Sequence, residues 1–219
     1  MISYNDVQNS QEINTYIRQA DQSLKTMGYT EHALAHVTHC AALAGQWLLA
    51  LGYSEREAEL VRIAAYMHDI GNVVNRSDHA QTGAVLAFRL LDKLGMPPEE
   101  IAVVITAIGN HDEATAFPVN PIAAALILAD KTDVRRSRVR NIDIAAFDIH
   151  DRVNYAVRKA EYDLDLQSRV LTLDIDIDTD ICSVMDYFEI FLGRMLLCRR
   201  AAAFFSLRFR LDINGVQLM

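Results

Sequence analysis

The sequence of 219 residues lacks the features of a secreted or membrane protein. Its three cysteines, Cys40, Cys182 and Cys198, are odd in number and widely spaced, so they predict neither a disulfide framework nor a thiolate zinc site. No stretch reaches the ~18 uninterrupted apolar residues of a membrane span, and residues 1–6 lack the charged and apolar regions of a signal peptide. We therefore expect a cytoplasmic protein that does not bind membranes.

The chain also lacks an excess of positive charge. It has 29 acidic and 21 basic side chains, which gives a net charge of −8. Because general nucleic-acid binding requires a basic surface, this balance argues against that class of function. The hydrophobic fraction of 51% is ample for a core, and the length fits one domain with an appendage or two small domains.

The most informative stretch is an apolar segment, Ala64–Met67, that leads directly into His68 and Asp69. Gly71 can adopt the positive φ that ends a helix, so we expect the His-Asp pair at a helix end, where both side chains can turn into one cleft. Imidazole and carboxylate bind borderline and hard divalent metals. The pair therefore predicts part of a metal site, which needs further ligands from elsewhere.

Further candidate ligands interrupt apolar helical segments. His36, His79 and His111 each do so, and Asp130 ends the apolar run Ile122–Ala129. A carboxylate that faces a core without a partner is energetically costly, and a metal ion would remove that cost.

Two histidines compete for the role of the first ligand. A helix capped by Thr30 would carry both His32 and His36 on one face, because residues four apart are neighbours on a helix. The residues alone leave this choice open.

Apolar periodicity and capping signals predict that most of these residues lie at or near helix ends, with His36 in mid-helix as the exception. An all-helical domain with a cleft among helix ends follows. We expect helices over residues 10–27, from Thr30 to near Gly52, from Ser54 to His68-Asp69, from His79 to Gly95, from Pro97 to His111 and from Asn120 to Asp130.

The pattern changes after about residue 165. Residues 170–178 alternate apolar and polar side chains, which predicts a half-buried strand. Residues 180–203 have a broad apolar helical face, and alternation resumes over 207–213 up to Asn214-Gly215, a strong hairpin signal. We interpret this region as a small α+β unit for docking or for forming a homodimer.

The order of the candidate ligands resembles that of the HD superfamily of metal-dependent phosphohydrolases, over roughly residues 29 to 160. The resemblance implies a two-metal site in which Asp69 bridges both metals and is the catalytic residue. In such proteins a small apolar pair follows the first histidine four and five residues on, here Cys40 and Ala41, which places His36 before His32. The implied ligands are His36, His68, Asp69 and Asp130 for one metal, and His79 and His111 for the second.

The expected fold is therefore mostly α, an HD-type helical bundle with a small C-terminal α+β appendage of strand, helix and hairpin. We expect an N-terminal packing helix over 1–28, the HD-type metal-binding domain over 29–164 and the α+β unit over 165–219.

Mixed His and Asp ligands without cysteine favour two divalent ions of Fe or Mn, with Mg or Ni as alternatives. Two metals about 3.5 to 4 Å apart can share a hydroxide that attacks phosphorus. We expect hydrolysis of a phosphate ester or anhydride of a small nucleotide-like metabolite. Two alternatives remain: a mixed-valent di-iron oxygenase of the same superfamily, and a catalytically silent nucleotide-binding sensor.

One departure narrows the substrate. Many HD proteins that cleave cyclic dinucleotides have a motif that resembles His-Asp-Ile-Gly-Lys, and they also carry a Gly-Tyr-Pro motif. Here Asn72 replaces the lysine and no Gly-Tyr-Pro occurs. Cleavage of cyclic di-GMP is therefore not expected.

A basic stripe follows the last candidate ligand. Lys131, Arg135 and Arg138 are spaced i, i+4 and i+7, where they would bind a small phosphorylated substrate through charge-assisted hydrogen bonds. The alternative is a solvated helix face paired with Asp133 or Asp143.

Overall fold

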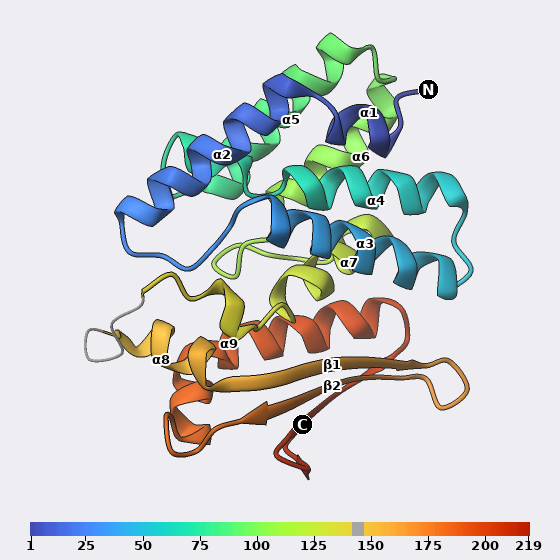
Figure 1. Ribbon diagram of the computed structural model, residues 1–219. Coiled ribbons are helices and arrows are strands. Elements are labelled where there is room, and N and C mark those ends of the chain that lie inside the picture. The colour runs from blue at the N-terminus through green and yellow to red at the C-terminus, as the bar shows by residue number, and fades with distance from the viewer. Residues whose placement is uncertain (142–146) are drawn as a thin grey trace. The chain divides into compact units, whose positions relative to one another are not determined.

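The computed structural model describes residues 1–141 and 147–219 and contains two compact units, residues 1–130 and 131–219. The predicted fold class is confirmed: the chain is mostly helical, with a small C-terminal sheet (Figure 1). Every helix within the described residues is too short or too polar to cross a membrane. The division into three domains that the sequence predicted stays a prediction, because the two compact units do not test it.

The first unit is built from helices. Within it α3 packs along α4, α5 packs along α6, and both α2 and α5 contact the short 3-10 helix η1. The elements are α1 (Tyr4–Gln8), α2 (Gln11–Thr26), α3 (Leu34–Ala50), α4 (Glu55–Met67), η1 (Ile70–Val73), α5 (His79–Leu94), α6 (Pro98–Gly109) and α7 (Pro121–Lys131, whose last residue begins the second unit).

Most helix starts follow from local capping. The Ser10 side chain accepts a hydrogen bond from the Ile13 amide, and Ser54 forms the expected capping box with Glu57 at the start of α4. Asn120 accepts a hydrogen bond from the Ala123 amide at 2.7 Å, which starts α7. These contacts satisfy amide groups that have no partner within the helix.

The predicted start of α3 at Thr30 is wrong. The helix begins at Leu34, because the amides before it bond to side chains instead: the His32 amide donates to Asp21 Oδ1 at 2.9 Å. His32 therefore precedes the helix, and His36 lies in its first turn rather than in mid-helix. All six candidate ligands consequently lie at or next to helix ends.

Gly71 also differs from expectation. It does not have a positive φ and lies within η1. A Cβ atom at this position would come within 2.0 Å of the His79 carbonyl oxygen and 2.5 Å of the Gly83 amide nitrogen. Glycine is therefore needed here because the backbone of α5 approaches closely, which brings His79 next to the His68-Asp69 pair.

The second unit carries a four-stranded sheet of order β1-β2-β3-β4. The β1–β2 and β3–β4 pairs are antiparallel, whereas β2 and β3 are parallel and are joined through α9. The elements are η2 (Arg136–Arg138), α8 (Ile149–Ala156), β1 (Val157–Asp165), β2 (Val170–Ile177), α9 (Val184–Phe204), β3 (Arg208–Ile213) and β4 (Val216–Gln217).

The strand, helix and hairpin expected in this unit are confirmed as β2, α9 and β3–β4. The sequence reading missed β1, which pairs with β2 in the register Leu164 to Leu171. The sequence does contain a signal for this strand, because Ala160, Tyr162 and Leu164 alternate with charged residues. The α9 helix begins at Val184, later than expected, because Ser183 forms a capping box with Asp186.

Candidate metal centre

The first unit brings all six candidate ligands together in its interior. None of these residues is more than 7% exposed. His36 lies in the first turn of α3, His68 caps the end of α4, Asp69 precedes η1, His79 opens α5, His111 follows α6, and Asp130 is the penultimate residue of α7.

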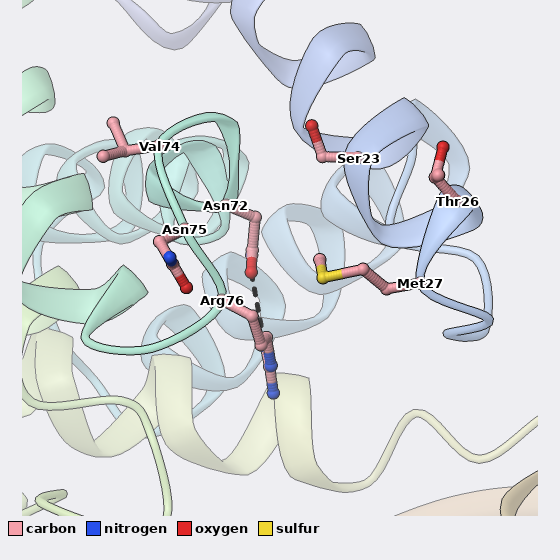
Figure 2. A pocket seen from close by; sticks show the side chains of 7 residues that line it. All are labelled: Ser23, Thr26, Met27, Asn72, Val74, Asn75 and Arg76. Atoms are coloured by element: carbon pink, nitrogen blue, oxygen red, sulfur yellow. Dashed lines mark hydrogen bonds between the residues drawn. The ribbon is translucent and has the colours of Figure 1, made fainter.

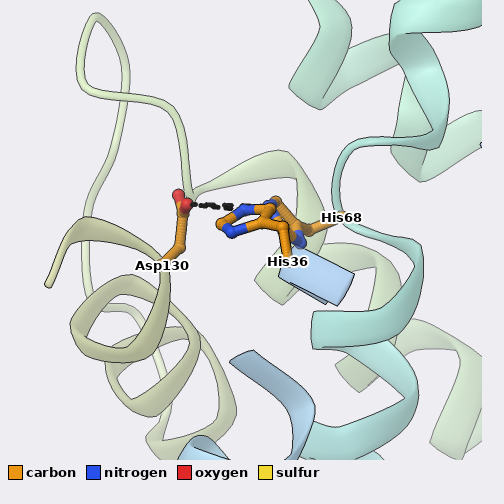
Figure 3. A group of neighbouring side chains, drawn as sticks. All are labelled: His36, His68 and Asp130. Atoms are coloured by element: carbon orange, nitrogen blue, oxygen red, sulfur yellow. Dashed lines mark ion pairs between the residues drawn. The ribbon is translucent and has the colours of Figure 1, made fainter. Parts of the chain in front are cut away.

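One group consists of His36, His68 and Asp130, with one oxygen of Asp69. Figure 3 shows the Asp130 carboxylate directed at the two imidazole rings. Asp130 Oδ1 lies 3.4 Å from His36 Nε2 and 3.7 Å from His68 Nε2. Asp69 Oδ2 lies 3.2 Å from His68 Nε2 and 3.8 Å from His36 Nε2. The ligand atoms of His36, His68 and Asp130 all lie within 4.8 Å of one another, which is close enough to share one metal ion.

The second group consists of His79 and His111, with the other oxygen of Asp69. The two Nε2 atoms lie 3.2 Å apart, and Asp69 Oδ1 lies 3.6 Å from His79 Nε2. Oδ2 of Asp69 therefore faces His36 and His68, whereas its Oδ1 faces His79. This is the geometry that a carboxylate needs to bridge two cations.

Hydrogen bonds orient the rings of the centre. Nδ1 of His68 lies 2.7 Å from the Ala65 carbonyl oxygen, and Nδ1 of His111 lies 2.6 Å from that of Ile108. His79 Nδ1 makes the same kind of contact with the Arg76 carbonyl at 3.1 Å. A carbonyl only accepts, so each Nδ1 carries the proton and the Nε2 lone pair of the neutral ring faces the centre.

This arrangement fits a metal. Lone pairs of two Nε2 atoms at 3.2 Å repel each other unless a cation lies between them. Nε2 of His68 is buried and makes no hydrogen bond within the described residues, although carboxylate oxygens surround it. Imidazole nitrogens and carboxylate oxygens are suitable donors for divalent ions. A cation would satisfy each of these atoms.

The electrostatics of the centre agree with this. Burial alone would lower the pKa of the His68 imidazole, but the carboxylates of Asp69 and Asp130 outweigh it and raise that pKa to about 10. Burial likewise opposes ionisation of Asp69, yet His68 and the neighbouring imidazoles hold its pKa well below the usual value. The centre therefore attracts positive charge.

Two further side chains, Asn72 and Arg76, lie beside the centre. Asn72 Nδ2 donates to Asp69 Oδ1 at 2.9 Å, which orients the carboxylate. Arg76 Nη1 lies 3.4 Å from Asn72 Oδ1 and 3.3 Å from His79 Nε2. The sequence contains one signal for this pair: Asn72 and Arg76 are four residues apart and lie between the candidate ligands Asp69 and His79.

The predicted basic stripe does not form. Helix α7 ends at Lys131, so Arg135 and Arg138 do not continue a helical face. Arg135 Nη2 donates to Asp133 Oδ2 at 2.9 Å, and Arg138 Nη1 donates to the Asp133 carbonyl at 2.8 Å. Asp133 is the partner that the alternative named, but the predicted solvated helix face is absent, because α7 has ended and Arg138 is buried. Contact of the three basic residues with a substrate stays a prediction, and Asp143 lies outside the described residues.

The choice between His32 and His36 is informed by geometry. The His32 ring centroid lies 5.7 Å from that of His36, and its Nδ1 is 2.7 Å from the Thr30 carbonyl oxygen. His36 Nε2 instead faces Asp130. The position of His36 agrees with its predicted role as the first ligand, which stays a prediction.

The fold and the site together define a helical protein with a buried His and Asp centre suited to divalent metals. The chain matches the HD domain over residues 33–189 and therefore belongs to the HD domain family. It is 25% identical over 181 residues to the uncharacterized protein MJ1020 of Methanocaldococcus jannaschii, a match that covers 72% of this chain and 70% of the relative.

A solved structure is also similar. It is the crystal structure of a predicted HD superfamily hydrolase from an uncultured Thermotogales bacterium, with 23% sequence identity and a TM-score of 0.45. The match covers 57% of this chain and 68% of the other.

Proposed function

We propose that this HD domain protein is a hydrolase that cleaves a phosphate ester or anhydride of a small nucleotide-like metabolite. The observation that carries the proposal is the convergence of six buried His and Asp side chains around Asp69, whose two oxygens face separate groups of imidazoles. Two divalent ions in these groups, Fe or Mn in the first instance, would activate water and neutralise the charge of the phosphate.

The residues of the chain would position these components. Asp69 would hold both ions, since one oxygen faces His68 and the other faces His79. The carbonyl contacts of the three Nδ1 atoms fix the imidazole rings before any metal arrives, which reduces the reorganisation required on binding. Asn72 fixes the bridging carboxylate through its 2.9 Å hydrogen bond.

The first experiment is elemental analysis of metal per chain, on protein purified without chelators, beside the His79→Ala and His111→Ala variants. We expect close to two metals in the wild type and one in each variant. A single metal that neither substitution changes would contradict the two-metal centre, and would make His79 and His111 ordinary or substrate-binding residues.

The activity is tested by release of inorganic phosphate from a panel of nucleotides with Mn, Fe, Mg or Ni. Release should proceed without oxygen and should disappear in the double variant His68→Ala, Asp69→Ala. Turnover that strictly requires oxygen and iron would instead indicate the di-iron oxygenase. Nucleotide binding without turnover, and undiminished biological function in the double variant, would indicate a sensor.

A further inference from the structure

A pocket of about 350 Å³ adjoins the metal centre in the first unit. One wall is the C-terminal end of α2 and the other is the segment from η1 to the residues before α5. Figure 2 shows Met27 reaching from α2 towards Asn72 and Arg76. The lining residues are Ser23, Thr26, Met27, Asn72, Val74, Asn75 and Arg76.

Two of these lining residues also contact the predicted metal ligands. Asn72 Nδ2 donates to Asp69 Oδ1 at 2.9 Å, and Arg76 Nη1 lies 3.3 Å from His79 Nε2. The same guanidinium nitrogen lies 3.4 Å from Asn72 Oδ1. The pocket wall and the metal centre are therefore linked through the side chains of Asn72 and Arg76.

The contact between Arg76 and His79 cannot persist when His79 binds a metal. Nε2 of a neutral imidazole has a single lone pair, which either accepts the Arg76 hydrogen bond or coordinates a cation. Metal binding therefore removes an acceptor from Arg76. It also leaves a permanently charged guanidinium beside a dication, and their repulsion is relieved by an anion that contacts both.

Other contacts keep Arg76 near this position. Asn72 Oδ1 accepts from it, and its guanidinium carbon lies 5.6 Å from the centre of the Tyr29 ring, within the range of a cation–π contact. Guanidinium has five N–H donors in a planar fork that matches two phosphate oxygens. Donors not used by Asn72 can therefore bind a phosphate that also touches the metals.

The rest of the pocket is neutral. Among the described residues that line it, Arg76 carries the charge. The Ser23 and Thr26 hydroxyls donate to backbone carbonyls of α2, so their oxygens can accept hydrogen bonds, and Asn75 adds an amide group. We propose that Arg76 binds the phosphate of the substrate and that this pocket holds the neutral, hydroxyl-bearing group attached to it, a sugar or nucleoside. This inference rests on the proposed hydrolase function and names the binding side of the same site.

The anion contact is tested with inorganic phosphate, titrated calorimetrically into Mn-loaded protein. Arg76→Ala should weaken phosphate binding by roughly 10- to 100-fold, the effect of losing a charged hydrogen-bond donor, and Arg76→Lys should recover part of it. Arg89→Ala, an exposed arginine on α5, is the matched control and should bind phosphate normally. Metal per chain, measured on each variant, should not change.

The pocket itself is tested with Ser23→Phe, which adds a ring to its α2 wall. This variant should bind adenosine 5′-monophosphate at least about 10-fold more weakly than the wild type while its affinity for inorganic phosphate stays the same. Equal affinity of Ser23→Phe and wild type for the nucleotide would overturn the assignment of the pocket.

Wild-type affinity for phosphate in Arg76→Ala would overturn the role of Arg76, as would absence of phosphate binding by the Mn-loaded wild type. Loss of metal in Arg76→Ala would do the same, because Arg76 would then act on the metal centre. These binding measurements do not depend on turnover. Phosphate held through Arg76 in a protein that hydrolyses no nucleotide would refute the proposed activity and leave the anion site standing.

Discussion

Asp69 lies between the two groups of predicted ligands. Its Oδ2 lies 3.2 Å from His68 Nε2 and its Oδ1 lies 3.6 Å from His79 Nε2. Asp69→Ala should therefore remove both metals, whereas His79→Ala should spare the group that contains His36 and His68. Inductively coupled plasma analysis of metal per chain distinguishes the two variants. Equal metal loss in both would contradict a bridging role for Asp69.

The residue types of the centre could be predicted from the sequence, but the position of Arg76 beside it could not. His68, Asp69 and Asp130 stand out because polar side chains that interrupt apolar helices need a partner. Arg76 lies in a loop, where an arginine is unremarkable. Its position 3.3 Å from His79 Nε2 depends on how the chain folds back between η1 and α5. For Arg135 and Arg138 the sequence predicted too much. Their spacing indicated a basic stripe along a helix, but α7 ends at Lys131, before either residue.

At the scale of elements, the packing of η1 against α5 depends on Gly71. A Cβ atom there would lie 2.0 Å from the His79 carbonyl oxygen, so Gly71→Ala must push the first turn of α5 away from the centre. We expect a loss of stability of about 1–3 kcal/mol or more, together with weaker metal binding. Denaturant unfolding and metal content per chain measure the two effects.

Gly109→Ala is the matched control for Gly71→Ala. Gly109 ends α6, and an added Cβ atom would meet only Ala84 Cβ at 3.7 Å, an ordinary contact. Because alanine is a better helix former than glycine, this variant should keep its metals and its stability. A Gly71→Ala protein that matched it in both measurements would refute the close approach of α5.

An ion pair between α4 and α6 should make the stability of the protein depend on pH. The Arg56 guanidinium makes two hydrogen bonds to the Glu100 carboxylate and lowers the pKa of that carboxyl below its usual 4.5. The stabilisation is therefore present above about pH 4.5 and is lost as pH falls through the lower folded-state pKa. Glu100→Gln should cost about 1 kcal/mol at pH 7.

Urea unfolding at pH 7 and near pH 2 measures this difference. The gap between wild type and Glu100→Gln should narrow at the lower pH, because protonation of Glu100 removes its charge in the wild type as well. Glu99→Gln, in the same first turn but exposed, should have little effect at either pH. A gap that does not change with pH would show that the ion pair contributes nothing.

The elements that the sequence predicted correctly are those with local signals. Ser10 and Ser54 cap their helices through contacts three residues away, which a sequence pattern can represent. The start of α3 is instead set by Asp21, eleven residues before the His32 amide that it binds. Strand β1 was missed because its alternating residues are mostly small or charged, and pairing with β2 decides its conformation.

At the scale of the whole molecule, the two compact units have different roles in the predicted chemistry. The six candidate ligands lie in residues 1–130, whereas the sheet and α9 lie in residues 131–219. The sequence instead placed a change from helical to alternating periodicity at about residue 165, and the domain division based on it stays a prediction. Formation of a homodimer through residues 165–219 stays a prediction, which light scattering of the full chain would test.

Confinement of the ligands to one unit predicts where metal should stabilise the protein. A ligand that binds only the folded state stabilises it by about 2.7 kcal/mol when the free ligand concentration is one hundred times the dissociation constant. For a chain of this length, that raises the unfolding temperature by roughly 6 to 10 °C. Calorimetry of Mn-loaded and chelated protein measures this shift. Asp69→Ala, which lacks the ligand predicted to hold both metals, should show little of it.

Hydrogen exchange locates the same effect along the chain. His68, His79 and His111 follow or open helices whose ends would be fixed by coordination, so amides near residues 66–82 and 108–112 should gain protection when Mn binds. Strands β1 to β4 contain none of the predicted ligands, so their protection should change little. Equal gains in both units would mean that metal binding is coupled to the sheet, and the predicted division of roles between the units would then be wrong.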